Sequence, residues 1–131
     1  MTVTIEKLPD APILIQTYAS DYSLRAEGAS AVDMSIQALD NQSQPVMFIM
    51  DMSEARLNFD DIVLGASLAT RQRAFFKHPM LLGAIVVTRD SMSALAARGL
   101  NAPGFDQSNV RVAGSRDAAL DYARRATQGA A

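Results

Sequence analysis

The chain has 131 residues, 49% of them hydrophobic, and a formal net charge of −2. This length predicts a single domain spanning residues 1–131, because domains typically contain about 100 to 200 residues. The absence of cysteine excludes disulfides, a thiol nucleophile and thiolate metal ligands. The amino terminus lacks the pattern of a signal peptide, and no apolar run approaches the roughly 20 residues of a spanning helix. We therefore expect a cytoplasmic protein without a membrane span.

The charges are unevenly distributed along the chain. The first 66 residues carry ten acidic and three basic side chains, whereas the remainder carries four acidic and nine basic ones. In one interpretation, the two halves neutralise each other across one fold. In the other, the charge asymmetry favours self-association, as a homodimer, and steers a charged partner toward the protein. The basic residues are scattered and lack interleaved aromatics, so we expect no nucleic-acid partner.

The first two predicted elements form a hairpin. Residues 2–7 alternate between polar and apolar side chains, and residues 13–18 form a second strand after a proline-containing turn, which favours antiparallel pairing. A helix follows over residues 22–39, with Ser20 or Asp21 as its cap. Gly28 weakens this helix, so the segment is interpreted either as two short helices or as a loop followed by a helix.

The rest of the chain alternates between strands and helices. The apolar runs predict buried strands over residues 46–50 and 81–87, and alternation predicts an edge strand over residues 110–113. The expected helices cover residues 59–77 with Asn58 as cap, a short segment from Asp90 or Ser91 to Ala97, and a final segment capped by Ser115 with Ala118, Ala119, Tyr122 and Ala123 facing inward. The order ββαβαβαβα predicts an α/β fold, with a mixed, mostly parallel central sheet of about five strands and about four helices.

The sequence offers little for catalysis. His78, the only histidine, precedes Pro79 at a helix end, where a surface residue or a partner of the helix dipole is commoner than a base. No histidine spacing typical of a metal site is present, and the usual serine-hydrolase, dinucleotide and P-loop patterns are absent. We expect no enzyme activity, no metal and no cofactor.

Polar residues follow the strand at residues 46–50, at the edge of the sheet where open α/β folds place their ligands. Acids in the first turn of the next helix either bind a cation or a basic partner, or only complement the helix dipole. The basic side chains further along this helix either receive an anionic group or form a solvated face. The candidate binding surface contains Asp51, Ser53, Asn58, Asp60, Asp61 and Arg71.

Three segments carry a resemblance to a known family: Asp51-Met52-Ser53, Phe59-Asp60-Asp61-Ile62 and the ending Val110–Leu120. Together with the order of the elements, they resemble the STAS family and its SpoIIAA-like branch, which includes bacterial anti-sigma-factor antagonists. The resemblance implies a SpoIIAA-like fold and a partner-binding surface at the helix start. It also implies that Asp61 stands where the antagonists carry a phosphorylated serine, so the usual serine switch is absent and a fixed negative charge replaces it.

Three functions remain open at this point. The first is a non-enzymatic STAS/SpoIIAA-like regulatory module that binds a protein partner, or a second copy of itself, through residues 52–65. The second is a sensor or carrier of a small apolar ligand, a lipid or a nucleotide, since the branch includes proteins compared with lipid-binding modules. The third is a carboxylate- or metal-dependent enzyme that uses Asp51, Asp60 or Asp61.

Overall fold

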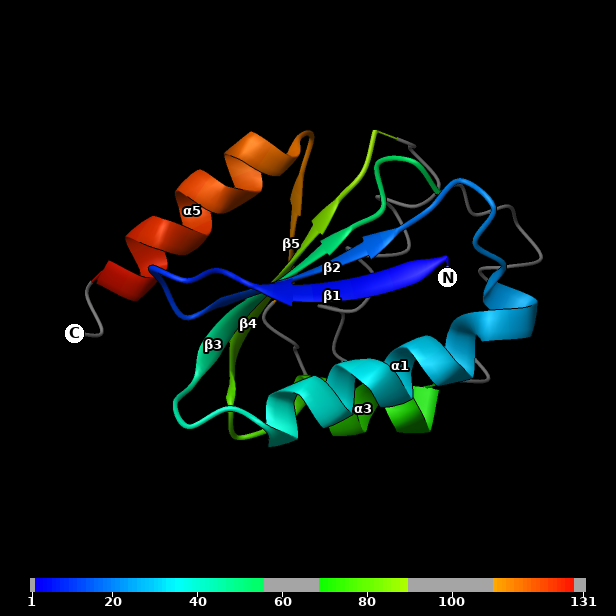
Figure 1. Cartoon of the computed structure of the whole chain (residues 1–131), viewed down its shortest axis with the longest axis horizontal. Helices are drawn as coiled ribbons and strands as arrows, with labels where there is room; N and C mark the ends of the chain where they lie inside the picture. Colours follow the sequence, from blue (N-terminus) through cyan, green and yellow to red (C-terminus); the bar gives the residue numbers. More distant parts are fainter. Residues whose placement is uncertain (1, 56–68, 90–109, 129–131) are drawn as a thin grey trace.

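The structure is a computed structural model that describes residues 2–55, 69–89 and 110–128 (Figure 1). Within these ranges the chain forms one five-stranded sheet of β1 (Val3–Lys7), β2 (Ile13–Tyr18), β3 (Val46–Asp51), β4 (Leu81–Val87) and β5 (Val110–Ala113). The helices are α1 (Leu24–Asp40), α3 (Ala69–Phe76) and α5 (Arg116–Gln128).

The strands lie in the sheet in the order of the sequence, from β1 to β5. β1 and β2 form the predicted antiparallel hairpin, with Lys7 opposite Leu14, and each of the following neighbours pairs in parallel. The fold class and the mostly parallel sheet are thus confirmed. The short helix predicted after Asp90 and the start of the helix predicted from Phe59 lie outside the described residues.

Helices cover both faces of the sheet: α5 packs on one face, and α1 and α3 pack on the other (Figure 1). The side chains of each central strand alternate between the two layers. On β3, Ile49 points toward α5, while Val46 and Phe48 belong to the cluster that includes Leu39 of α1 and Phe75 of α3. Burial on both faces explains why the central strands are uninterrupted apolar runs.

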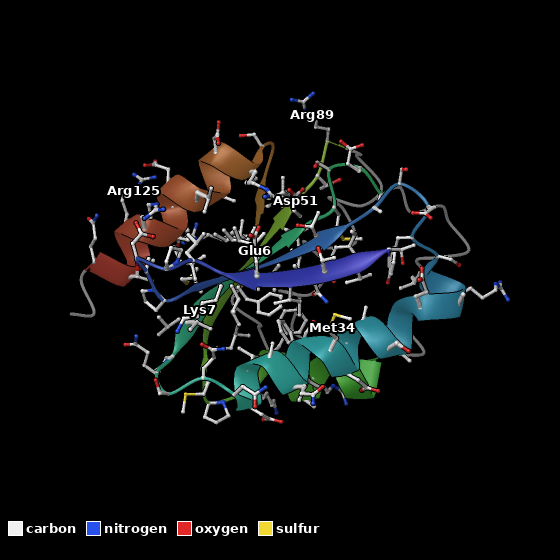
Figure 2. All side chains as sticks on the ribbon, viewed as in Figure 1. Glu6, Lys7, Met34, Asp51, Arg89 and Arg125 are labelled. Atoms are coloured by element: carbon white, nitrogen blue, oxygen red, sulfur yellow. The ribbon has the colours of Figure 1, made fainter. Side chains whose placement is uncertain are left out.

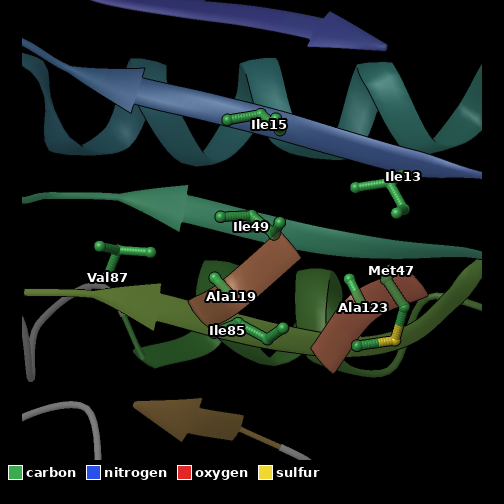
Figure 3. Close-up of a cluster of buried hydrophobic side chains, with 8 residues drawn as sticks. All are labelled: Ile13, Ile15, Met47, Ile49, Ile85, Val87, Ala119 and Ala123. Carbon is green, nitrogen blue, oxygen red and sulfur yellow. The ribbon is translucent and has the colours of Figure 1, made fainter. Parts of the chain in front are cut away.

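The α5 layer combines large aliphatic side chains from the sheet with two alanines from the helix (Figure 3). Ala119 and Ala123 are fully buried and four residues apart, so they lie on one face of the helix. Their small size allows the helix to approach the sheet closely. The prediction that Ala118 faces inward was wrong, because this residue is exposed. Tyr122 is half-buried, and the Arg111 guanidinium lies 4.6 Å from the centre of its ring.

Helix α1 is continuous, and the predicted break at Gly28 was wrong. Its cap is Ser23, rather than Ser20 or Asp21: the Ser23 hydroxyl accepts a hydrogen bond from the amide of Ala26 at 3.3 Å. Glu27 accepts one from the Ser23 amide at 3.0 Å and another from the Thr2 hydroxyl. A good cap is worth about 1 kcal/mol, which offsets the roughly 1 kcal/mol cost of a glycine inside a helix.

A buried hydrogen-bond network fixes α1 on β2. Gln16 is completely buried, and its side-chain amide donates to the carbonyl of Ala31 at 3.2 Å. Its carbonyl accepts hydrogen bonds from the hydroxyls of Tyr18 at 2.8 Å and Ser35 at 2.7 Å. Burial raises the pKa of Tyr18, so its hydroxyl stays protonated as the donor. The network orients the helix against the strand without leaving a buried polar atom unpaired.

Candidate functional site

Polar side chains gather where the parallel strands β2 and β3 end and where α5 begins. Thr17 and Asp51 are register partners on the two strands, and Arg116 is the first residue of α5. Asp51 and Glu6 of β1 lie on the side of the sheet that α5 covers (Figure 2). Thr17 lies on the same side, because it is two residues from Ile15, which packs in the α5 layer. This is the carboxyl edge of the sheet, where open α/β folds usually bind their ligands.

Asp51 is the centre of this group, and only 5% of its surface is exposed. The Nε of Arg116 donates to Oδ2 of Asp51 at 2.7 Å, and a terminal nitrogen of the same guanidinium donates to the hydroxyl of Thr17 at 2.8 Å. The other terminal nitrogen lies 3.7 Å from a carboxylate oxygen of Glu6. Arg116 thus links three strands to the start of α5.

The second oxygen of the Asp51 carboxylate shapes the loop that follows β3. Oδ1 accepts a hydrogen bond from the amide of Ser53 at 3.1 Å and another from its hydroxyl at 2.6 Å. The loop closes with a bond from the Ala55 amide to the Met52 carbonyl at 3.1 Å, and Ala55 is buried against Val3. Both ends of the loop are therefore anchored.

The two residues between these anchors, Ser53 and Glu54, are exposed. We call them the loop tip. Their side chains are held at the carboxyl edge of the sheet without being part of its core. The loop tip is therefore a fixed polar feature that another molecule can contact.

The electrostatics of Asp51 follow from this geometry. Burial acts to raise the pKa of its carboxyl group, but the hydrogen bonds from Ser53 and the charge and hydrogen bond of Arg116 outweigh it, and the pKa is lowered. The carboxylate stays ionised near neutral pH. A weakly basic carboxylate with both oxygens engaged is poorly suited to accept a proton from a substrate.

The arrangement also bears on metal binding. Within residues 2–55, 69–89 and 110–128, no group of three or more His, Cys, Asp or Glu side chains is placed to hold a metal ion. The Asp51 carboxylate forms an ion pair with Arg116 instead. The expectations of no metal and no catalysis stay predictions, since part of the predicted surface lies elsewhere in the chain.

The predicted site residues have different outcomes. Asp51, the last residue of β3, and Ser53, two residues later, are in direct contact. Asn58, Asp60 and Asp61 lie outside the described residues, and Arg71 belongs to α3, although its side chain is not described. For all six predicted residues the binding role stays a prediction.

Sequence reasoning missed Arg116, Thr17 and Glu6. A signal for the first two was present, because parallel strands end at one edge of a sheet and the helix after β5 must begin there. A cation at the start of the last helix is also unusual, since the positive end of the helix dipole disfavours it. The nearby carboxylates of Asp51 and Glu6 provide the compensating charge.

His78 is engaged at a different position in the fold. Its Nδ1 accepts a hydrogen bond from the amide of Met80 at 3.1 Å, so in the neutral ring Nε2 carries the hydrogen and donates to the carboxylate of Asp40 at 2.7 Å. The histidine connects the end of α1 to the turn before β4. With both ring nitrogens engaged, its observed role is structural.

Comparisons with known proteins support the fold. No protein-family model and no curated protein matches the chain. A crystal structure of an uncharacterized protein of the DUF3478 family from Shewanella loihica PV-4, which has a SpoIIAA-like fold, matches with a TM-score of 0.55 and 14% sequence identity, over 92% of this chain and 91% of that one. The chain therefore has a SpoIIAA-like fold. In the described part of the chain, no helix has the length and apolar character needed to cross a membrane.

The lowered pKa of Asp51 predicts a specific acid response. Its stabilising contribution is complete above the unfolded-state pKa of about 3.9, and it is lost as the pH falls through the lower folded-state pKa. The free energy of unfolding, measured by urea denaturation between about pH 6 and pH 2, should fall less steeply in Asp51→Asn than in the wild type. Parallel curves for the two proteins would contradict this assignment.

Proposed function

We propose that this chain is a non-enzymatic, SpoIIAA-like regulatory module that binds a protein partner through the carboxyl edge of its sheet. The supporting observation is the use of Asp51. This buried carboxylate is committed to Ser53 and Arg116 within the chain, and the result is a fixed loop tip rather than a reactive group. A rigid, exposed polar feature is well suited to recognition, because little conformational freedom is lost on binding.

The charge of the edge suggests the class of partner. Glu54 is exposed at the loop tip, and Asp60 and Asp61 follow closely in the sequence, while the charge of Arg116 is balanced by Asp51 and Glu6. Opposite charge on a partner speeds association and fixes its orientation. The proposed partner therefore presents a basic surface to this edge.

Charge reversal at the edge tests this function. The tagged chain would be used to capture proteins from its native host, with Glu54→Lys, and separately Asp60→Lys combined with Asp61→Lys, as edge variants. Asp121→Lys is the control matched to Glu54→Lys, because Asp121 is also exposed but lies within α5, where it pairs with Arg125. A partner identified by mass spectrometry should be recovered with the wild type and the control, and at least tenfold less with each edge variant.

The affinity of the purified partner, measured by calorimetry, should follow the same order. Unchanged affinity in both edge variants would remove the carboxyl edge as the binding surface. Equal losses in the edge variants and in Asp121→Lys would point to net charge alone and would also contradict the proposal.

A small apolar ligand is the alternative, and half-buried methionines favour it. Met50 and Met52 border two adjacent apolar clusters, and Met34 of α1 contacts one of them. Methionine adapts its shape to irregular ligands, although it is also common in protein cores.

A thermal-shift screen against fatty acids, phospholipids and nucleotides tests this alternative. A ligand at a hundredfold excess over its Kd stabilises the folded state by about 2.7 kcal/mol, which raises the melting temperature visibly. The alternative predicts a shift for the apolar ligands that is reduced by Met52→Gln. No shift with any of these compounds would remove it.

A further inference from the structure

We infer that Arg116 is a positioning residue for the loop tip, Ser53 and Glu54, although it is far from them in the sequence. The effect of Arg116 on partner binding rests on the proposed function. Its effect on the conformation of the loop tip rests only on contacts within the free chain. Arg116 does not bond to Ser53 itself. Its effect passes through the carboxylate of Asp51.

First, the two oxygens of the Asp51 carboxylate have different hydrogen-bond partners. Oδ2 is occupied by Arg116, and Oδ1 accepts both hydrogen bonds from Ser53. A carboxylate is planar, so fixing one oxygen fixes the other. Arg116 thereby directs Oδ1 toward the amide and the hydroxyl of Ser53.

The second step is the cost of leaving Asp51 without its cation. The side chain of Asp51 is 7% exposed, whereas that of Arg116 is 38% exposed. An ionised carboxylate that is nearly buried and unpaired is strongly unfavourable. Without the guanidinium, rotation of the carboxylate toward water relieves this cost, and that rotation breaks both bonds to Ser53.

The third step is the way in which Arg116 is itself held. Its guanidinium donates to the Thr17 hydroxyl while it binds Asp51, so β2 helps to set the position of the guanidinium. The planar geometry of arginine permits both bonds at once, which a lysine ammonium cannot reproduce in the same directions. Thr17 and Arg116 therefore act together on the loop after β3.

Amide hydrogen exchange in the free protein, followed residue by residue by NMR, provides the test. The variants are Arg116→Met, which removes the charge; Arg116→Lys, which keeps it; and Thr17→Val, which replaces the hydroxyl with a methyl group. Arg124→Met is the matched control, since Arg124 lies on the same helix and pairs with exposed Asp10 at 3.0 Å. The exchange rate of the Ser53 amide should rise at least tenfold in Arg116→Met, less in Arg116→Lys and Thr17→Val, and not at all in Arg124→Met.

A purely structural role for Arg116 in attaching α5 gives a different pattern. The amides of Ala118 and Ala119, which donate to Ser115, would then exchange faster while the Ser53 amide stayed unchanged, and this result would overturn the inference. If Arg116→Met does not fold, Thr17→Val and Arg116→Lys decide the question by the same comparison.

Binding measurements separate this inference from the proposed function. Recovery of the partner captured by the wild type should fall in Arg116→Met in step with the faster exchange at Ser53. Faster exchange with unchanged recovery would support the positioning role and contradict the loop tip as a binding surface. Unchanged exchange would overturn the positioning role, whatever the partner does.

Discussion

One buried carboxylate organises the carboxyl edge of the sheet. Asp51 ends the central strand β3, and its two oxygens serve two different parts of the fold: Ser53 in the adjacent loop and Arg116 at the start of α5. A nearly buried charge must be paired, so the loop, the strand and the helix are constrained together. The exposed loop tip depends on this pairing.

Much of the fold could be predicted because the relevant signals are local. Uninterrupted apolar runs predicted central strands covered on both faces, and strict alternation of strands and helices predicted parallel crossovers. The strand predicted over residues 46–50 is present and extends one residue further to Asp51, and the capping of the last helix by Ser115 was predicted correctly. These features arise from burial and from hydrogen bonds between near neighbours in the chain.

The remaining features depend on distant contacts and were not predicted. Arg116 is 65 residues from Asp51, and only the sheet order places the two side chains together. The Gln16 network joins a strand to a helix, and Gly28 is tolerated because the rest of α1 is well capped and packed. Ala118 and Ala119 are chemically identical neighbours, and only the packing of α5 on the sheet decides that Ala119 is buried while Ala118 is exposed.

We expect Asp51 and Arg116 to interact strongly enough to constrain this edge, and a double-mutant cycle measures that interaction most directly. The free energies of unfolding of the wild type, Asp51→Ala, Arg116→Ala and the double variant would be measured at pH 7 by urea denaturation. A pair of this burial predicts a coupling energy above about 1 kcal/mol, more than the roughly 0.2–1 kcal/mol typical of exposed pairs. A coupling energy near zero would contradict the account.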